Sequence, residues 1–281
     1  MQQDLLHRYI FDNLDVRGEL VQLEQTYSDI IANHNYPAPV KAMMGDLLVA
    51  TCLLTATIKF EGDIAVQIQG DGPVKYAVIN GDNQQNMRGV ARIQGEITGS
   101  SLSDLFGRGH MVITITPNKG EPYQGIVALQ GDTLGECLEL YFEQSEQLRT
   151  KLWIATENGV DSSRCAGMLL QILPVDKAKA EADFQHLEAL TATITDKELL
   201  ELDAETVLTR LYHQDSVRVF EPQAVNFVCG CSRQKTENAL VNVGQDVLLE
   251  DIEKHGEIKI SCNYCLKDYI FNKQEILDLF K

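Results

Sequence analysis

Two closely spaced cysteine pairs near the C-terminus constrain the fold of this chain more than any other feature. The pairs are Cys229 with Cys231 and Cys262 with Cys265, and thirty residues separate them. Four thiolates from two chain segments can close a tetrahedral cage around Zn²⁺. The same spacing also permits a disulfide within each pair. The pattern therefore indicates either a structural metal site or a redox-active one.

Length and charge exclude several classes of protein. The 281 residues suffice for about two domains of ordinary size. The formal net charge is −17 at pH 7, whereas binding to a phosphate backbone needs clustered Lys and Arg. The longest apolar run, residues 47–58, is far shorter than the ~20 residues that span a bilayer. We therefore expect no binding to nucleic acid or membrane.

The cysteine usage favours a reducing compartment. The sequence begins with Met1-Gln2-Gln3-Asp4, without the basic and then apolar pattern of a secretory signal. The cysteine count, seven, is odd, and stable disulfides are rare in the cytosol. We expect a cytoplasmic protein whose paired cysteines are metal ligands or redox-active. The remaining cysteines, which lie in apolar or helical segments, are predicted to be buried; they are Cys52, Cys137 and Cys165.

Residues 1–175 are predicted to form an α+β domain built on antiparallel sheet. Turn signals at residues 70–73 and 80–83 are typical of hairpins. Helical spacing of apolar residues or alternating patterns predict the following elements: helices over 19–34, 40–54 and 134–147, and strands over 64–68, 111–116, 125–130, 152–156 and 168–173. Clustered strands with few crossover helices indicate an α+β fold.

Residues 176–226 are predicted to be a helical linker. The segment is rich in acidic residues, and Thr195 with Glu198 has the form of a capping box at the start of a helix. The helix that follows carries an apolar stripe that needs a partner surface. Five leucines make up this stripe, hereafter the leucine stripe: Leu199, Leu200, Leu202, Leu208 and Leu211. We expect the linker to dock through them.

Residues 227–281 form a short module that contains both cysteine pairs. Ser232 is placed to cap a helix that ends at Gly244, and Asp246 to cap another that ends at Gly256. Residues 257–261 and 266–271 are predicted to pair as a hairpin with Cys262 and Cys265 in its turn, and Asn272 with Glu275 to begin a last helix. A module of about 55 residues is marginal for an independent core, so a bound metal would supply the missing stability.

No enzyme active site is evident in the sequence. The Gly70-Asp71-Gly72 run lacks the Gly-Lys-Ser/Thr ending of a phosphate-binding loop. No catalytic Ser/His/Asp order or His-Glu-x-x-His pattern occurs. The histidine nearest to the cysteines is His255, but four thiols already complete a tetrahedron. We therefore predict a protein that is not an enzyme.

With these residues in view, the chain resembles the 33-kDa heat shock protein family, which are bacterial redox-regulated holdase chaperones. The C-x-C and C-x-x-C motifs with a spacer near thirty residues are the cysteine signature of that family. Further matching segments are residues 45–51, 69–73, 87–92, 141–147, 221–222 and 231–233. The likeness covers nearly the whole chain.

The resemblance implies an ATP-independent holdase that acts in oxidative stress. In the reduced state the four signature cysteines would hold one Zn²⁺ per chain, and the chaperone would be inactive. Oxidation would form the disulfides Cys229–Cys231 and Cys262–Cys265, release the zinc, and unfold the C-terminal module and the linker. The oxidised protein would be a homodimer that binds unfolding client proteins, and the leucine stripe is our candidate for the contact.

Two other functions remain open from the residues alone. A zinc module could bind a protein partner without redox gating. From residue 226 onward, seven Lys/Arg stand against nine Asp/Glu, so no basic face supports nucleic-acid binding. The second alternative is a thiol-disulfide oxidoreductase that uses Cys262 and Cys265. Such enzymes place the motif at a helix N-terminus, whereas here it is predicted in a hairpin turn.

Overall fold

The protein is represented by a computed structural model that describes residues 4–159, 162–173 and 177–281. The chain divides into two compact units, residues 1–227 and 228–281. We call the first the body and the second the thiol module. The predicted boundary between residues 175 and 176 lies outside the described residues. The described part of the body includes the predicted linker.

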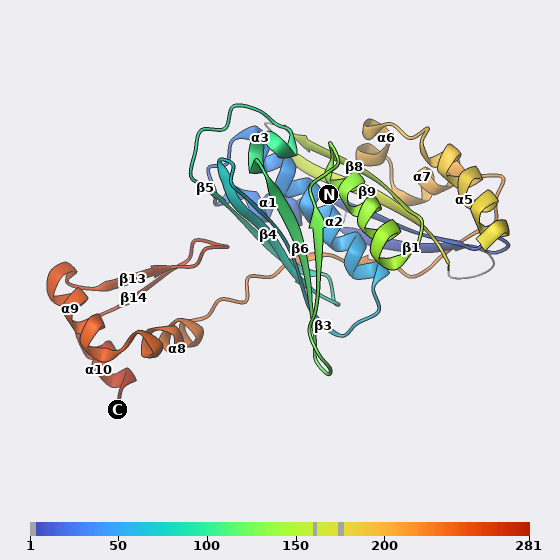
Figure 1. Cartoon of the computed structure of the whole chain (residues 1–281). Helices are drawn as coiled ribbons and strands as arrows, with labels where there is room; N and C mark the ends of the chain where they lie inside the picture. The colour runs from blue at the N-terminus through green and yellow to red at the C-terminus, as the bar shows by residue number, and fades with distance from the viewer. Residues whose placement is uncertain (1–3, 160–161, 174–176) are drawn as a thin grey trace. The chain divides into compact units, whose positions relative to one another are not determined.

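Two sheets make up the framework of the body (Figure 1). The first sheet has the order β10-β1-β2-β9-β8 with β11 beside β1, and all its pairings are antiparallel. Its strands are β1 (Leu5–Phe11), β2 (Val16–Leu23), β8 (Thr150–Asn158), β9 (Ser163–Ile172), β10 (Val217–Val219) and β11 (Gln223–Ala224). The second sheet has the order β12-β5-β4-β3-β6-β7, in which β12 alone pairs in parallel. Its strands are β3 (Gly62–Gly70), β4 (Val74–Asp82), β5 (Asn86–Ile93), β6 (Gly109–Pro117), β7 (Tyr123–Ala128) and β12 (Asn226–Phe227).

Helix α2 (Ala38–Thr57) is the centre of the core and contacts strands of both sheets. Its apolar residues occupy all sides of the helix, as expected where protein surrounds it. Met44, Leu47 and Leu48 are fully buried. By length and composition this helix could cross a membrane, but 78% of its apolar window is buried inside the protein. Its hydrophobicity is therefore that of a core helix.

Smaller helices precede the linker in the body. They are α1 (Gln25–Ala32), α3 (Leu102–Phe106), α4 (Leu134–Tyr141), and a π-helical turn, η1 (Phe142–Glu146), that continues α4. The predicted helices over 40–54 and 134–147 and the predicted antiparallel strands are confirmed. The α+β fold class is therefore confirmed.

Two local predictions for the body were wrong. The helix predicted over residues 19–34 begins only at Gln25, because Val16–Leu23 is strand β2. This strand pairs with β1 and β9 and is covered on both faces, so it lacks the alternation that identifies a half-exposed strand. The turn predicted at residues 80–83 is displaced, since Asn80 and Gly81 still pair with β3.

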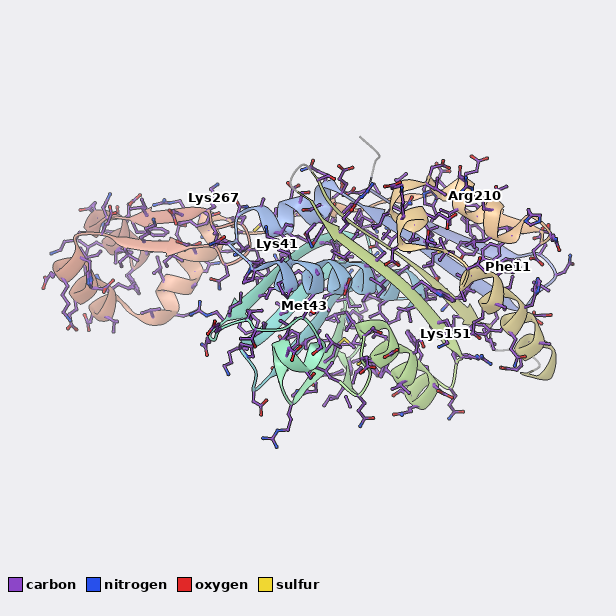
Figure 2. All side chains as sticks on the ribbon, turned by 90° about the horizontal axis from the view of Figure 1, so that it is seen from above. Phe11, Lys41, Met43, Lys151, Arg210 and Lys267 are labelled. Carbon is purple, nitrogen blue, oxygen red and sulfur yellow. The ribbon has the colours of Figure 1, made fainter. Side chains whose placement is uncertain are left out.

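Three linker helices cover the outer face of the first sheet: α5 (Lys177–Thr191), α6 (Asp196–Glu201) and α7 (Ala204–Tyr212). Phe184 and Leu187 of α5 and Tyr212 of α7 join one buried cluster with Tyr9 and Phe11 of β1. The rings of Phe11 and Tyr212 meet edge to face, with centroids 4.9 Å apart. Figure 2 labels Phe11 on the part of the first sheet that lies beside the linker helices. The linker is thus docked by apolar burial in this structure.

Polar contacts fix the position of the docked helices. The side-chain amide of Gln22 on β2 donates to the carbonyls of Leu199 and Leu202, at 2.8 and 2.6 Å, and so binds the C-terminal end of α6. Arg149 beside β8 forms ion pairs with Glu181 and Glu188 of α5. These bonds favour one position of the helices on the sheet, which apolar burial alone would not define.

A buried carboxyl group in the first sheet makes the stability of the body depend on pH. Glu19 is 2% exposed, and its Oε2 has no hydrogen-bond partner among the described residues. Burial raises its pKa to about 7, although Arg17 and Arg8 oppose the shift. This pKa lies above that of a glutamate in the unfolded chain, so protonation of Glu19 favours the folded body. That contribution to the free energy of unfolding is fully present below pH 4.5 and is lost as the pH rises through 7.

We predict that Glu19→Gln removes this pH dependence. The variant should gain stability over the parent as the pH rises from 5 to 8.5, by about 3 kcal/mol at most. Urea unfolding of the body at both pH values measures the difference. The exposed Glu121→Gln provides the matched control and should show no such gain. An equal difference between parent and Glu19→Gln at both pH values would contradict the prediction.

The thiol module is a hairpin with three helices around a small core. Its elements are α8 (Arg233–Val243), α9 (Gln245–His255), β13 (Ile258–Ser261), β14 (Asp268–Phe271) and α10 (Lys273–Leu279). Seven apolar residues form its buried core. They are Leu240, Leu248, Ile252, Ile258, Tyr269, Phe271 and Ile276. So few buried residues are consistent with a module that depends on a further constraint.

Capping residues define the helices of the module. Ser232 caps α8, and Asn272 with Glu275 forms a capping box on α10, as predicted. The prediction that Asp246 caps the next helix was wrong, because α9 begins at Gln245 with Gly244 as its N-cap. Gly244 has a positive φ of 97°. Glycine adopts this conformation without steric strain, and so α9 can follow α8 directly. Asp246 instead lies in the first turn of α9, where a carboxylate is favoured by the helix dipole.

Candidate metal centre

The four signature cysteines come from two short turns of the thiol module. Cys229 and Cys231 lie in the segment that leads into the Ser232 cap of α8. Cys262 and Cys265 lie in the turn between β13 and β14, which closes through a bond from the Cys262 amide to the Lys267 carbonyl at 2.9 Å. The hairpin turn predicted for this pair is confirmed, and the pair does not start a helix as in thiol-disulfide oxidoreductases.

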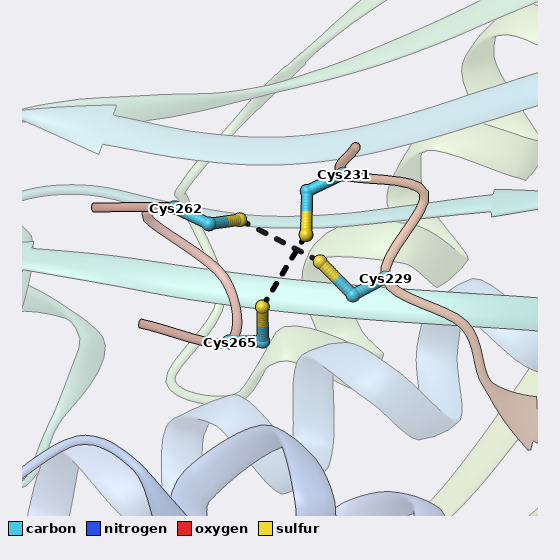
Figure 3. Close-up of side chains that lie close together, drawn as sticks. All are labelled: Cys229, Cys231, Cys262 and Cys265. Atoms are coloured by element: carbon cyan, nitrogen blue, oxygen red, sulfur yellow. Dashed lines mark hydrogen bonds between the residues drawn. The ribbon is translucent and has the colours of Figure 1, made fainter. Parts of the chain in front are cut away.

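The four sulfur atoms converge on one point (Figure 3). All Sγ atoms lie within 4.8 Å of one another. The Sγ atoms of Cys229 and Cys262 are 3.5 Å apart, as are those of Cys231 and Cys265. Metal–sulfur bonds of 2.3 Å in a tetrahedron place the sulfurs about 3.8 Å apart. The cluster therefore has the dimensions of a metal-binding tetrathiolate, and its four cysteines are free thiols.

The chemistry of the donors fits a soft metal ion. Four thiolates in tetrahedral array favour Zn²⁺ or iron over hard cations such as Mg²⁺ and Ca²⁺. All four cysteines are partly exposed, so the ion and small oxidants could both reach them. His255 is exposed and has its ring 3.1 Å from a carboxylate oxygen of Asp251, outside the cluster. The residues thus provide a site that can hold a metal ion.

Surroundings differ among the four sulfurs. Burial raises the pKa of Cys229 to about 12. By contrast, the hydroxyl of Tyr269 lies 3.2 Å from Sγ of Cys231, and this hydrogen bond lowers the pKa of Cys231 to about 7. Tyr269 is 6% exposed and belongs to the module core. It therefore couples the sulfur cluster to the packing of the hairpin. No sequence pattern distinguishes this tyrosine from other strand residues.

The three remaining cysteines are buried, as predicted. Cys52 and Cys137 have no exposed surface, and Cys165 is 1% exposed. Burial raises the pKa of each of these thiols. They are packing residues of the body rather than reactive groups.

The leucine stripe is covered by the first sheet in this structure. Leu199, Leu208 and Leu211 are 2%, 4% and 8% exposed, and Leu200 and Leu202 are half-buried against the same apolar cluster. The sequence pattern indicated that these residues need a partner surface, and the outer face of β1, β2 and β9 provides it. Gln22, which binds the end of α6, was not identified from the sequence because an isolated polar residue in an apolar strand gives no signal of its partner.

Fold and site together define an α+β protein with a separate thiol module whose four clustered cysteines can hold a metal ion. A family profile described as "Hsp33 protein" matches residues 4–272. The chain is 68% identical over 280 residues to a "33 kDa chaperonin" of Pseudoalteromonas translucida, with 100% of both chains covered. It is 54% identical to a "33 kDa chaperonin" of Aeromonas salmonicida, with 99% of this chain and 95% of that one covered.

The fold has a counterpart among solved structures. The crystal structure of a 33 kDa chaperonin from Thermotoga maritima matches with a TM-score of 0.87 over 99% of this chain and 98% of that chain, at 22% sequence identity. The chain belongs to the Hsp33 family of molecular chaperones.

Proposed function

We propose that this chaperone is a redox-regulated, ATP-independent holdase of the bacterial cytoplasm. The observation that carries the proposal is the tetrathiolate cluster in a module with a core of seven residues. In the reduced state one Zn²⁺ would be bound by Cys229, Cys231, Cys262 and Cys265. The metal would link the chain before α8 to the β13–β14 turn. Loss of that link would leave too little buried surface to keep the module folded.

Oxidation would break the link chemically. Hydrogen peroxide transfers one oxygen atom to a thiolate, which becomes a sulfenic acid, and the peroxide's other oxygen leaves as hydroxide, which takes up a proton to give water. A second thiolate then attacks the sulfenic sulfur, forms a disulfide, and releases another water after protonation. Two such reactions would give Cys229–Cys231 and Cys262–Cys265. In the folded cluster the 3.5 Å contacts run across the pairs, but in an unfolded module the neighbours in sequence meet most often.

Unfolding of the module would free the linker. The linker helices are followed in the chain by β10, β11 and β12 and then by the thiol module. Undocking would expose the leucine stripe together with the outer face of the first sheet, which now bury each other. We propose that these surfaces bind unfolding client proteins, that the oxidised chaperone is a homodimer, and that its net charge of −17 keeps client complexes soluble.

One titration tests the whole sequence of events. Reduced protein is oxidised stepwise while zinc release, free thiols, helicity and suppression of client aggregation are recorded. Suppression should appear together with zinc release and helix loss, and mass spectrometry should find the two local disulfides. Full suppression by the reduced, zinc-bound protein would refute redox gating and favour a module that binds partners constitutively.

The leucine stripe has its own test. Replacement of Leu199, Leu208 and Leu211 by Ser should lower aggregation suppression by the oxidised protein at least severalfold. Each replacement removes apolar surface whose burial against a client would contribute about 2 kcal/mol. The matched control replaces the exposed Val241 and Val247 of the thiol module by Ser and should retain activity. Unchanged suppression by the triple variant would show that clients bind elsewhere.

A further inference from the structure

A large pocket in the body is formed entirely by residues between Arg17 and Gln171. Its volume is about 620 Å³, within the range of small-molecule sites. The end of α2, the end of the first sheet, η1 and the β6–β7 hairpin surround it. Apolar and aromatic side chains make up much of its wall, among them Ile58, Phe60, Ile115, Tyr141, Phe142 and Leu148.

One half-buried cation lies in this apolar wall. Arg17 on β2 lines the pocket, and its Nη2 donates to the carbonyl of Thr57 at 3.0 Å and to Oε1 of Gln171 at 2.5 Å. Gln171 is 1% exposed and is itself held by a bond from its amide to Oγ1 of Thr150, at 2.8 Å. The guanidinium is therefore fixed by neutral acceptors at the end of α2.

The acceptors that Arg17 contacts directly among the described residues are neutral, and its Nε is buried without a hydrogen-bond partner among them. Glu19, two residues away on the same strand, interacts with Arg17 only through space, and burial raises its pKa to about 7. Glu19 therefore balances the charge of the partly desolvated guanidinium only in part, and a partly desolvated charge that is not fully balanced is costly. An anionic ligand would offset that cost.

The other charged residues that line the pocket differ from Arg17 in burial. Lys59, Glu61, Lys119, Glu121 and Glu146 are all exposed. Their signs are mixed, so the rim has little net charge to select a ligand. Arg17 combines with the apolar walls to make a site with one positive end and a long apolar surface.

We propose that this pocket binds an amphipathic carboxylate, a medium-chain fatty acid or a molecule of similar shape, with its carboxylate toward Arg17 and its chain against Phe60 and Phe142. The pocket lies on the α2 side of the first sheet, whereas the linker helices cover the other face. Binding therefore requires neither oxidation nor release of the linker, and it is independent of the proposed client site.

Calorimetric titration of the reduced full-length protein with decanoate, and with decanol as its uncharged counterpart, tests this proposal. Decanoate should bind in a one-to-one ratio. Arg17→Met keeps the apolar length of the side chain and removes its charge. It should therefore lower the affinity for decanoate at least tenfold and change the affinity for decanol less than twofold. Arg17→Lys should recover part of the affinity for decanoate.

Two further variants locate the ligand. Ile58→Trp fills the pocket and should abolish binding of both compounds, whereas Lys119→Met removes a rim cation and should change decanoate affinity less than twofold. Failure of decanoate to bind the parent would overturn the proposal. So would equal weakening by Arg17→Met and Lys119→Met, or loss of decanol binding in Arg17→Met, because the role of Arg17 would then be structural.

Discussion

Removal of the proposed Zn²⁺ is expected to unfold residues 228–281 and to leave the body folded. The module buries seven apolar residues in its own core, too few for substantial independent stability. Binding of structural Zn²⁺ to such cages contributes about 10–16 kcal/mol. Its loss therefore exceeds any stability that the remaining contacts provide. The body has its own clusters around α2 and on the outer face of the first sheet, and so keeps its core.

Amide hydrogen exchange of the reduced protein, before and after a zinc chelator, measures this effect. Protection of amides in α8, β13 and β14 should fall at least about 1000-fold, whereas amides of α2 should keep theirs. Cys262→Ser should resemble the chelated protein without any chelator. His255→Ala is the matched control, because His255 is exposed and lies outside the cluster; it should bind one metal ion as the parent does. Protected amides in a metal-free module would show that the sulfur cage is not what holds the fold.

The sequence was most informative where local chemistry decides structure. The cysteine spacing predicted a four-thiol site, and the sulfurs do converge within 4.8 Å. Ser232 and Asn272 predicted helix starts because a cap is a contact between near neighbours in the chain. The same holds for the hairpin turn that carries Cys262 and Cys265.

Features that depend on distant partners were not predictable in this way. Glu19–Leu23 has helical spacing of apolar residues, but pairing with β9 makes it a strand, and β9 is more than a hundred residues away. The bond from Gln22 to the end of α6 and the contact of Tyr269 with Cys231 likewise join chain segments that only the fold brings together. The pocket at Arg17 is a third case, since η1 and the β6–β7 hairpin form its walls.

Truncation of Phe184 on α5 is expected to activate the chaperone without any oxidant. This side chain has no exposed surface, packs in the cluster between α5 and the first sheet, and lies 4.9 Å below the guanidinium of Arg149. Replacing a buried Phe by Ala costs about 3–5 kcal/mol. The substitution destabilises the docked state alone, because the cavity forms only where Phe184 is packed between α5 and the first sheet. The undocked population should therefore rise by a factor of about 100 or more.

Two measurements on reduced, zinc-loaded Phe184→Ala separate docking from client binding. Amides of α5 and α7 should exchange about 100-fold faster than in the parent, and the variant should suppress aggregation of a thermally unfolding client. Phe220→Ala is the matched control, because Phe220 is 44% exposed and its truncation should cost less than about 0.5 kcal/mol. Faster exchange without suppression would mean that the docked linker does not mask the client surface. Unchanged exchange would mean that the cluster around Phe184 does not hold the linker, and that the thiol module must control client binding by another route.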